Sequence, residues 1–416
     1  MREGTIKRVI AIRNNRRDYV LFKNASRAEE IALYYGFKPT DIPLITKDDL
    51  AQAKHLAESE SKPRSIPEGN QCYFDICPEE KIALLRLYFE KNMQSLPQPV
   101  CLFLEGHFGT NPSKKHAHEE SRYTLEMLGT SKSIAEATLI KTAVEILRAE
   151  GFENLYLDIN SIGDRDSIVR FHKELVIYYR KNLQKLESHC RQTFKRDPFE
   201  LFECENELCL TLKEEAPKSM AFLSEQSRIH FKEVLEYLES IDIPYRINPY
   251  IVGNRLFSTH TIFQIRSLSE KEENISWPLA VGVRYNALSK KLGMRRDLPA
   301  IGVTIAYKKK GHVDVRKEVK MKKSKIFFIQ LGFDAKLKSL SVIEMLRQEG
   351  IAVEQSLSRD KLASQFALAE SMRISFSLIM GQKEAMDNTV IVRNMDTRSQ
   401  ETVHIENIVE YLKKLK

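Results

Sequence analysis

Thiol and imidazole side chains are the first candidates for chemistry in this sequence. Two pairs of cysteines are five positions apart, namely Cys72 with Cys77 and Cys204 with Cys209. A metal ion tolerates that spacing, but no second pair or histidine completes either set, so ordinary thiols are the better interpretation. His116 and His118 stand beside lysines in SKKHAHEESR, where positive charge opposes a bound cation. We therefore predict no metal site.

The composition describes a globular chain with a mild positive charge. It has 416 residues, 42% of them hydrophobic and 29% charged, which suggests two or three domains. Lysine and arginine total 65 against 57 acidic residues, a net charge of +8 that permits a nucleic-acid partner without requiring one.

Several kinds of site and segment are absent from the sequence. It contains no GxGxxG, no P-loop and no HExxH motif. No apolar run reaches the roughly 18 residues of a membrane span, and the start, MREGTIKRVIAIRNNRRDY, lacks the features of a secretory signal. Six cysteines in so long a chain indicate reduced thiols, so we expect a cytoplasmic location.

Apolar periodicity locates the elements that must position any site. Helices are predicted over 27–35, 78–92, 133–150 and 166–179, and strands over 100–103, 155–159, 262–265, 279–283 and 299–305. Residues 105–122 read as a loop rich in glycine, lysine and histidine. The lysine-rich run 308–325 is typical of a solvated linker and marks a domain boundary.

The segment 326–416 alternates strands with helices. Such a rhythm predicts a mainly parallel sheet covered on both faces, and about 90 residues are enough for it to fold alone.

Three stretches of the chain resemble the histidyl-tRNA synthetase family of class II aminoacyl-tRNA synthetases. The C-terminal stretch contains SQFxLAE, IMGQKE and NTVIVRNMDTRSQETV, and the middle stretch contains INSIGD, CRQTFKRDPFELFECE and HFKEVLEYL. The stretch near the start is YYGFKPTDIP, which is similar to the class II dimer-interface motif. The resemblance implies an α/β (α+β) fold: a class II antiparallel sheet core over 1–320 with a helical insertion near 160–245, then an anticodon-binding-like α/β domain over 321–416. It also implies a homodimer.

The same resemblance implies a residual amino-acid pocket. CPEEK (77–81) is similar to the family's Pro-Glu-Gly-Thr element, with Glu80 and Lys81 in place of its Gly and Thr. Glu126 matches a carboxylate that binds the substrate's α-amino group, and Arg122 stands where a glutamine is expected. The implied pocket residues are Pro78, Glu79, Arg122, Glu126, Phe257, Ser258 and Tyr285.

The arginines that bind phosphates in the family are missing at the matching positions, which read Gly109, Gly253 and Lys309. Fixed guanidinium groups stabilise the charge that develops when ATP forms an adenylate, and each loss costs about 3–4 kcal/mol of that stabilisation. Two or three losses imply a rate deficit of about 10⁴ or more. The chain therefore departs from this family at the positions whose arginines stabilise adenylate formation.

Three functions remain open. The first is a catalytically degenerate synthetase-like protein that binds tRNA or another partner, with Arg393 and Arg398 as candidate RNA contacts. The second is an active histidine–tRNA ligase, which alone would require ATP and Mg²⁺ and would use Arg122, Arg255 or Lys309 as replacements. The third is a regulatory subunit resembling that of ATP phosphoribosyltransferase, against which the intact region 326–416 argues.

Overall fold

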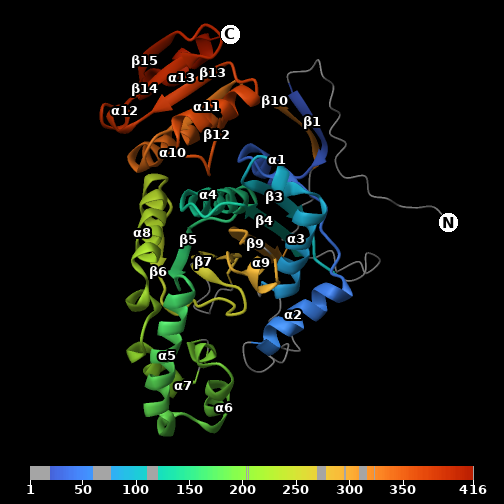
Figure 1. The fold of residues 1–416 in the computed structure, drawn as a ribbon, viewed down its shortest axis with the longest axis vertical. Coiled ribbons are helices and arrows are strands. Elements are labelled where there is room, and N and C mark those ends of the chain that lie inside the picture. The colour runs from blue at the N-terminus through green and yellow to red at the C-terminus, as the bar shows by residue number, and fades with distance from the viewer. Residues whose placement is uncertain are drawn as a thin grey trace, which may run out of the picture. The chain divides into compact units, whose positions relative to one another are not determined.

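The computed structural model describes residues 19–59, 76–109, 120–202, 204, 206–268, 278–294, 297–308, 316–322 and 324–415 (Figure 1). Within these ranges the chain forms two compact units. The core unit comprises Thr40–Val234 and Pro244–His312, and the terminal unit comprises Met1–Pro39, Leu235–Ile243 and Val313–Lys416. In the described residues, no helix combines the length and the apolar character needed to cross a membrane.

The core unit is built on a sheet with the strand order β3-β4-β9-β8-β7-β5-β6. Its strands are β3 (Val100–Glu105), β4 (Glu120–Leu128), β5 (Leu155–Ser161), β6 (Tyr245–Ile247), β7 (Thr259–Ser267), β8 (Ala280–Arg284) and β9 (Ala300–Lys308). Every pairing from β3 to β5 is antiparallel, and β6 runs parallel to β5. This is the antiparallel core that the sequence predicted.

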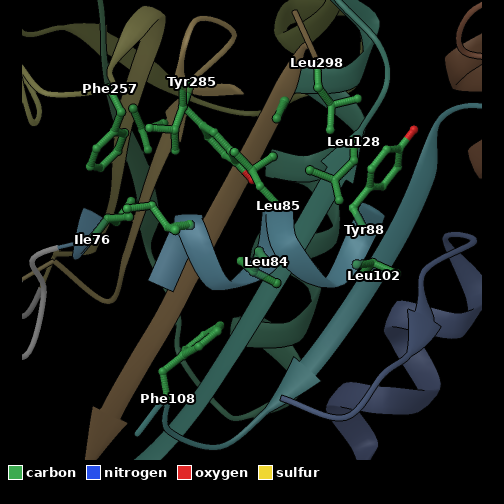
Figure 2. Packing of buried hydrophobic residues seen from close by; sticks show 14 of the residues in the cluster. Ile76, Leu84, Leu85, Tyr88, Leu102, Phe108, Leu128, Phe257, Tyr285 and Leu298 are labelled. Atoms are coloured by element: carbon green, nitrogen blue, oxygen red, sulfur yellow. The ribbon is translucent and has the colours of Figure 1, made fainter. Parts of the chain in front are cut away.

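Helices surround this sheet. They are α2 (Lys47–Ser59), α3 (Pro78–Glu90), α4 (Ile134–Ala149), α5 (Arg165–Lys181), α6 (Ser188–Arg196), α7 (Glu207–Glu215), α9 (Leu288–Lys291) and α8 (Glu225–Ser240), the last shared with the terminal unit. Figure 2 shows α3 crossing one face of the strands, where Leu84 and Leu85 pack near Leu128 and Tyr285. Helix α3 thus covers the part of the sheet that holds the candidate pocket.

The expected loop at 105–122 is wrong at its end, because β4 begins at Glu120. Arg122, Thr124 and Glu126 alternate with Tyr123, Leu125 and Met127, which is the period-two pattern of a strand. The glycine, lysine and histidine residues of 106–118 are typical of a loop and obscure this alternation in the sequence. Residues 110–119, with His116 and His118, lie outside the described part of the chain.

The terminal unit contains a five-stranded sheet with the order β12-β11-β13-β14-β15. Its elements are β11 (Ile326–Gln330), α10 (Phe333–Gln348), β12 (Val353–Gln355), α11 (Leu362–Ser371), β13 (Phe376–Met380), α12 (Gln382–Met386), β14 (Thr389–Asn394), β15 (Gln400–His404) and α13 (Ile408–Lys414). Ile326 and Phe328 pack with α10 and α13, whereas Phe327 and Ile329 pack with α11. Both faces of the sheet are therefore covered, as predicted.

The prediction of a mainly parallel sheet is wrong for half of its pairings. β11 pairs in parallel with β12 and β13, but β13–β14 and β14–β15 are antiparallel. A parallel crossover needs a dozen or more residues. Only Gly381–Asn388, with the short helix α12, joins β13 to β14, so the chain reverses instead.

The lysine-rich run 308–325 is not wholly a solvated linker. Lys317–Lys322 forms strand β10, which pairs antiparallel with β1 (Tyr19–Ala25). Lys317 also forms an ion pair with Glu30 in α1 (Arg27–Tyr34), 3.0 Å from nitrogen to oxygen. The pairing with β1 gives the backbone amide and carbonyl groups of this stretch hydrogen-bond partners, while lysine side chains extend into solvent. Composition alone does not reveal such a pairing. A further short strand, β2 (Lys38–Pro39), follows α1.

Candidate functional site

The candidate site lies on the polar face of β4. Alternate residues of a strand share a face, so Arg122, Thr124 and Glu126 point to the same side, and all three are buried. Gly302 of β9 stands directly opposite Glu126. A Cβ at Gly302 would lie 2.2 Å from Glu126 Oε2, so only glycine leaves room for this carboxylate.

Glu126 is fully engaged by two groups of the chain itself. The Lys81 ammonium forms an ion pair with Glu126 Oε1, and the two side chains are 1% and 0% exposed. Tyr285 donates its hydroxyl to Glu126 Oε2 at 2.6 Å, and the Lys81 nitrogen lies 5.0 Å from the centre of the same tyrosine ring. Burial and the Glu126 charge raise the pKa of Tyr285 well above its usual value, so the hydroxyl keeps its proton.

Arg122 is engaged in the same way. Its Nη2 lies 2.8 and 2.9 Å from the two carboxylate oxygens of Glu80, and both side chains are about nine-tenths buried. Burial raises the pKa of Glu80 despite the neighbouring Arg122 and Lys81 charges. Because Glu80 and Lys81 are adjacent at the start of α3, one helix start supplies a partner to both Arg122 and Glu126 of β4.

The other predicted pocket residues lie around this network. Pro78 and Glu79 are half-buried in the first turn of α3, and in the described residues Glu79 forms no hydrogen bond or ion pair. Phe257 is buried edge-on to Tyr285, with ring centres 6.4 Å apart. Figure 2 shows the two side chains beside one another. In the part of the chain that the structure describes, the buried Ser258 hydroxyl has no hydrogen-bond partner. The structure therefore brings Glu126, Tyr285 and Phe257 together, while Arg122 is held by Glu80.

The positions where the family carries arginines differ in what the structure describes. Gly109 lies beyond the end of β3 and accepts a hydrogen bond from the Ile45 amide at 3.0 Å. Gly253 has a φ of +63°, and a Cβ there would lie 2.8 Å from both Ser258 Oγ and Ile262 Cδ1. A side chain is therefore excluded at Gly253 by backbone conformation as well as by space. Lys309 lies outside the described residues.

A second buried network, which the sequence analysis missed, centres on Glu136 of α4. Arg284 donates to both of its carboxylate oxygens, at 2.6 and 2.5 Å, and His230 Nε2 lies 2.7 Å away. Burial alone would raise the pKa of Glu136, but the Arg284 and His230 charges outweigh it and hold the pKa at about 2. The sequence carries two signals of this network, a lone glutamate on the apolar face of helix 133–150 and Arg284 in GVRYN (282–286), which resembles a motif of the family.

His260, beside this network, makes stability depend on pH. Burial, together with the charges of His230 and Arg284, lowers its pKa to about 4, against the attraction of Glu136 and Asp164. In the unfolded chain the His260 imidazole therefore takes up a proton near pH 6.5, whereas in the folded chain it does so only near pH 4. We expect stability to fall as the pH drops through this window, by up to about 3 kcal/mol.

The test is urea denaturation at pH 7 and pH 5. His260→Asn, which removes the titrating ring and tolerates the φ of 49° at this position, should flatten the pH dependence. The matched control is His404→Asn at an exposed histidine. Equal slopes in wild type and His260→Asn would refute the assignment.

The candidate RNA contacts lie in the terminal unit. Arg393 of β14 places its guanidinium 5.2 Å from the ring centre of Phe366 and is half-buried. Arg398 is exposed in the turn before β15 and has a φ of 62°. The two arginines are thus on one hairpin, of which Arg398 is the more accessible.

Together these features define a class II aminoacyl-tRNA synthetase fold with a C-terminal anticodon-binding domain. Residues 325–415 match the family model described as an anticodon binding domain. Over 403 residues the chain is 30% identical to the histidine–tRNA ligase of Caldicellulosiruptor bescii, covering 93% of each chain. It is 24% identical over 403 residues to that of Staphylococcus aureus strain JH9, covering 94% of each.

The chain belongs to the histidine–tRNA ligase family. Among solved structures, apo Staphylococcus aureus histidyl-tRNA synthetase aligns with 92% of this chain and 93% of its own. The TM-score is 0.49 and the sequence identity 23%.

Proposed function

We propose that this protein is a member of the family that binds tRNA without activating an amino acid. The observation that carries the proposal is the buried ion pair between Lys81 and Glu126. In the family pattern, the carboxylate at the position of Glu126 binds the α-ammonium group of the substrate. Here the chain supplies its own ammonium group to that carboxylate.

Displacing Lys81 would be costly for an incoming amino acid. The Lys81 ammonium would have to leave its carboxylate in a site where both side chains are at most 1% exposed. A buried charge that loses its partner destabilises a protein by about 3–5 kcal/mol. That cost is comparable to the whole binding free energy of a millimolar ligand, about 4 kcal/mol.

The replacement arginines that an active enzyme would need are also engaged. Arg122 is bound by Glu80. Arg255 donates to Asp197 at 3.0 Å and lies over the Phe199 ring, 5.1 Å from its centre. Both guanidinium groups already have a carboxylate partner, with which the phosphate oxygens of ATP would have to compete, and this supports the absence of adenylate chemistry.

The proposal is tested by equilibrium dialysis of the full chain with radiolabelled L-histidine, beside the Staphylococcus aureus ligase as a positive control. We expect no saturable binding to this chain at histidine concentrations that saturate the control. Saturable, stoichiometric binding would contradict the proposal, because it would require Glu126 to accept a second ammonium group.

RNA binding is tested through the accessible arginine of the hairpin. We expect Arg398→Asn to weaken tRNA binding and to lower the slope of log K against log salt by about 1, since one phosphate contact is lost. The matched control is Arg373→Asn, an exposed arginine that also has a positive φ, 56°. Filter binding over a salt series is the measurement, and equal slopes for the two variants would exclude this contact.

The remaining parts of the proposal concern assembly and organisation. We infer a homodimer through the segment 34–43, a boundary between the core and the anticodon-binding domain near residue 321, and a cytoplasmic location. Sedimentation at micromolar concentration tests the first of these, with a monomer as the contradicting result.

A further inference from the structure

Three cysteine thiols converge in the helical segment of the core unit. They come from α6, from the turn before α7, and from α7, as Cys190, Cys204 and Cys209. Their sulfur atoms all lie within 4.8 Å of one another, and Cys190 and Cys209 are buried. The sequence showed only the pair 204 and 209, because Cys190 joins them through folding.

The local fold explains why the thiols meet. Helix α5 turns Phe171, Leu175 and Tyr179 toward a small core to which the short helix Pro198–Phe202 adds Phe199 and Phe202. The thiols complete that core between α6 and α7, each nine residues long. Figure 1 shows α5, α6 and α7 gathered at one end of the core unit. Short elements with so small a core gain much from a cross-link.

The sulfur separation fits a shared metal ion. Cys190 Sγ and Cys204 Sγ are 3.7 Å apart. With zinc–sulfur bonds of about 2.3 Å, two sulfurs of a tetrahedral site lie about 3.8 Å apart. A disulfide would need about 2.05 Å. The spacing of Cys204 and Cys209 also falls within the C-x₄-C pattern of structural zinc sites.

The surroundings suit a negatively charged metal centre. Cys190 and Cys209 are each the third residue of their helix, where the helix dipole offsets part of the charge of a metal-bound thiolate. Without a cation, burial raises the pKa of both thiols. Two ammonium groups lie over the Tyr250 ring that packs against this core, Lys218 at 4.4 Å and Lys213 at 5.0 Å from its centre. Three thiolates on a divalent cation carry one net negative charge, and these two ammonium groups are on side chains next to the same small core.

Two polar side chains lie near the thiols. The hydroxyl of Tyr179 is fully buried and, among the described residues, has no hydrogen-bond partner. A metal-bound thiolate that came within hydrogen-bond distance would supply the acceptor that this hydroxyl lacks. His189 Nδ1 lies 3.4 Å from Cys190 Sγ, but it is not among the ligand atoms that lie within 4.8 Å of one another, so the described residues bring together three ligands.

We propose that Cys190, Cys204 and Cys209 bind one structural Zn²⁺ ion that fixes α6 and α7 to the rest of the insertion. The ion acts here as a cross-link, and the site lies apart from Glu126 and its partners. Binding releases the thiol protons to solvent and changes no oxidation state.

The test uses untagged full-length protein prepared without oxygen, with zinc measured by inductively coupled plasma mass spectrometry. We expect about one zinc per chain. After exchange into Co²⁺, we expect a thiolate-to-cobalt charge-transfer band in the near ultraviolet and the strong visible bands of tetrahedral cobalt. Cys209→Ser should weaken Zn²⁺ affinity by more than about tenfold, whereas Cys101→Ser, a half-buried thiol on β3, should leave it unchanged.

Two results would overturn the proposal. One is wild-type protein that holds no zinc and gives no charge-transfer band with Co²⁺, which needs no variant and so does not depend on Cys209→Ser folding. The other is a disulfide among these cysteines in the anaerobic protein, found by mass spectrometry after alkylation.

Discussion

Replacing Lys81 with methionine will lower the free energy of unfolding by about 3–5 kcal/mol. The substitution leaves the Glu126 carboxylate fully buried and, among the described residues, with the Tyr285 hydroxyl alone to bind it. An uncompensated charge in such a place is far costlier than the loss of a surface ion pair. Urea denaturation followed by circular dichroism at pH 7 measures the effect.

Two further variants separate this cause from simple truncation. Lys91→Met, at an exposed position just after α3, should change stability by no more than about 0.5 kcal/mol. The double variant Lys81→Met/Glu126→Gln removes both charges and should recover to within about 2 kcal/mol of wild type. If Lys81→Met behaved like Lys91→Met, Glu126 would have another cationic partner and this account of the site would fail.

Replacing Arg284 with methionine will have a similar effect, about 3–5 kcal/mol, through the other buried network. Arg284 is fully buried and, besides Glu136, donates to the Thr130 carbonyl at 2.9 Å. Arg284 therefore links β8 to the start of α4. Methionine has a similar volume to arginine but carries no charge. Within the described ranges, the Glu136 carboxylate would then keep His230 as its one ionic partner.

This loss should shrink at lower pH, which distinguishes it from a packing defect. Burial pushes the pKa of Glu136 up, and in wild type Arg284 and His230 hold it at about 2. Without Arg284 the pKa rises, so the carboxyl is neutralised by mild acid and its penalty disappears. Denaturation at pH 7 and pH 5 tests this, with the exposed Arg228→Met as control. A loss of the same size at both pH values would contradict the electrostatic cause.

Local signals in the sequence were sufficient for most helices. Helices predicted over 27–35, 78–92 and 133–150 are present as α1, α3 and α4, because each has apolar periodicity and a readable end, such as Pro78 in the first turn of α3. Strand β4 was missed because the loop-forming residues before it hide its alternating pattern, and β10 was missed because its lysines resemble a linker and its partner β1 is distant in the sequence.

The site was only partly predictable for the same reason. The family resemblance pointed to Glu126 and Tyr285, which the structure brings into hydrogen-bond contact. It also singled out Glu80 and Lys81 as departures, but nothing local tells that they reach Arg122 and Glu126 on β4, more than 40 residues along the chain. The Cys190, Cys204 and Cys209 cluster has the same character, since its members meet only when α6 packs beside α7.

The measurement that tests the central claim most directly is histidine-dependent exchange between ATP and pyrophosphate, run beside the Staphylococcus aureus ligase. Because Lys81 holds Glu126, while Glu80 and Asp197 hold Arg122 and Arg255, we predict no exchange above background from folded wild-type protein. Exchange that depends on histidine and saturates with it would contradict the account and would show that this pocket opens to an amino acid.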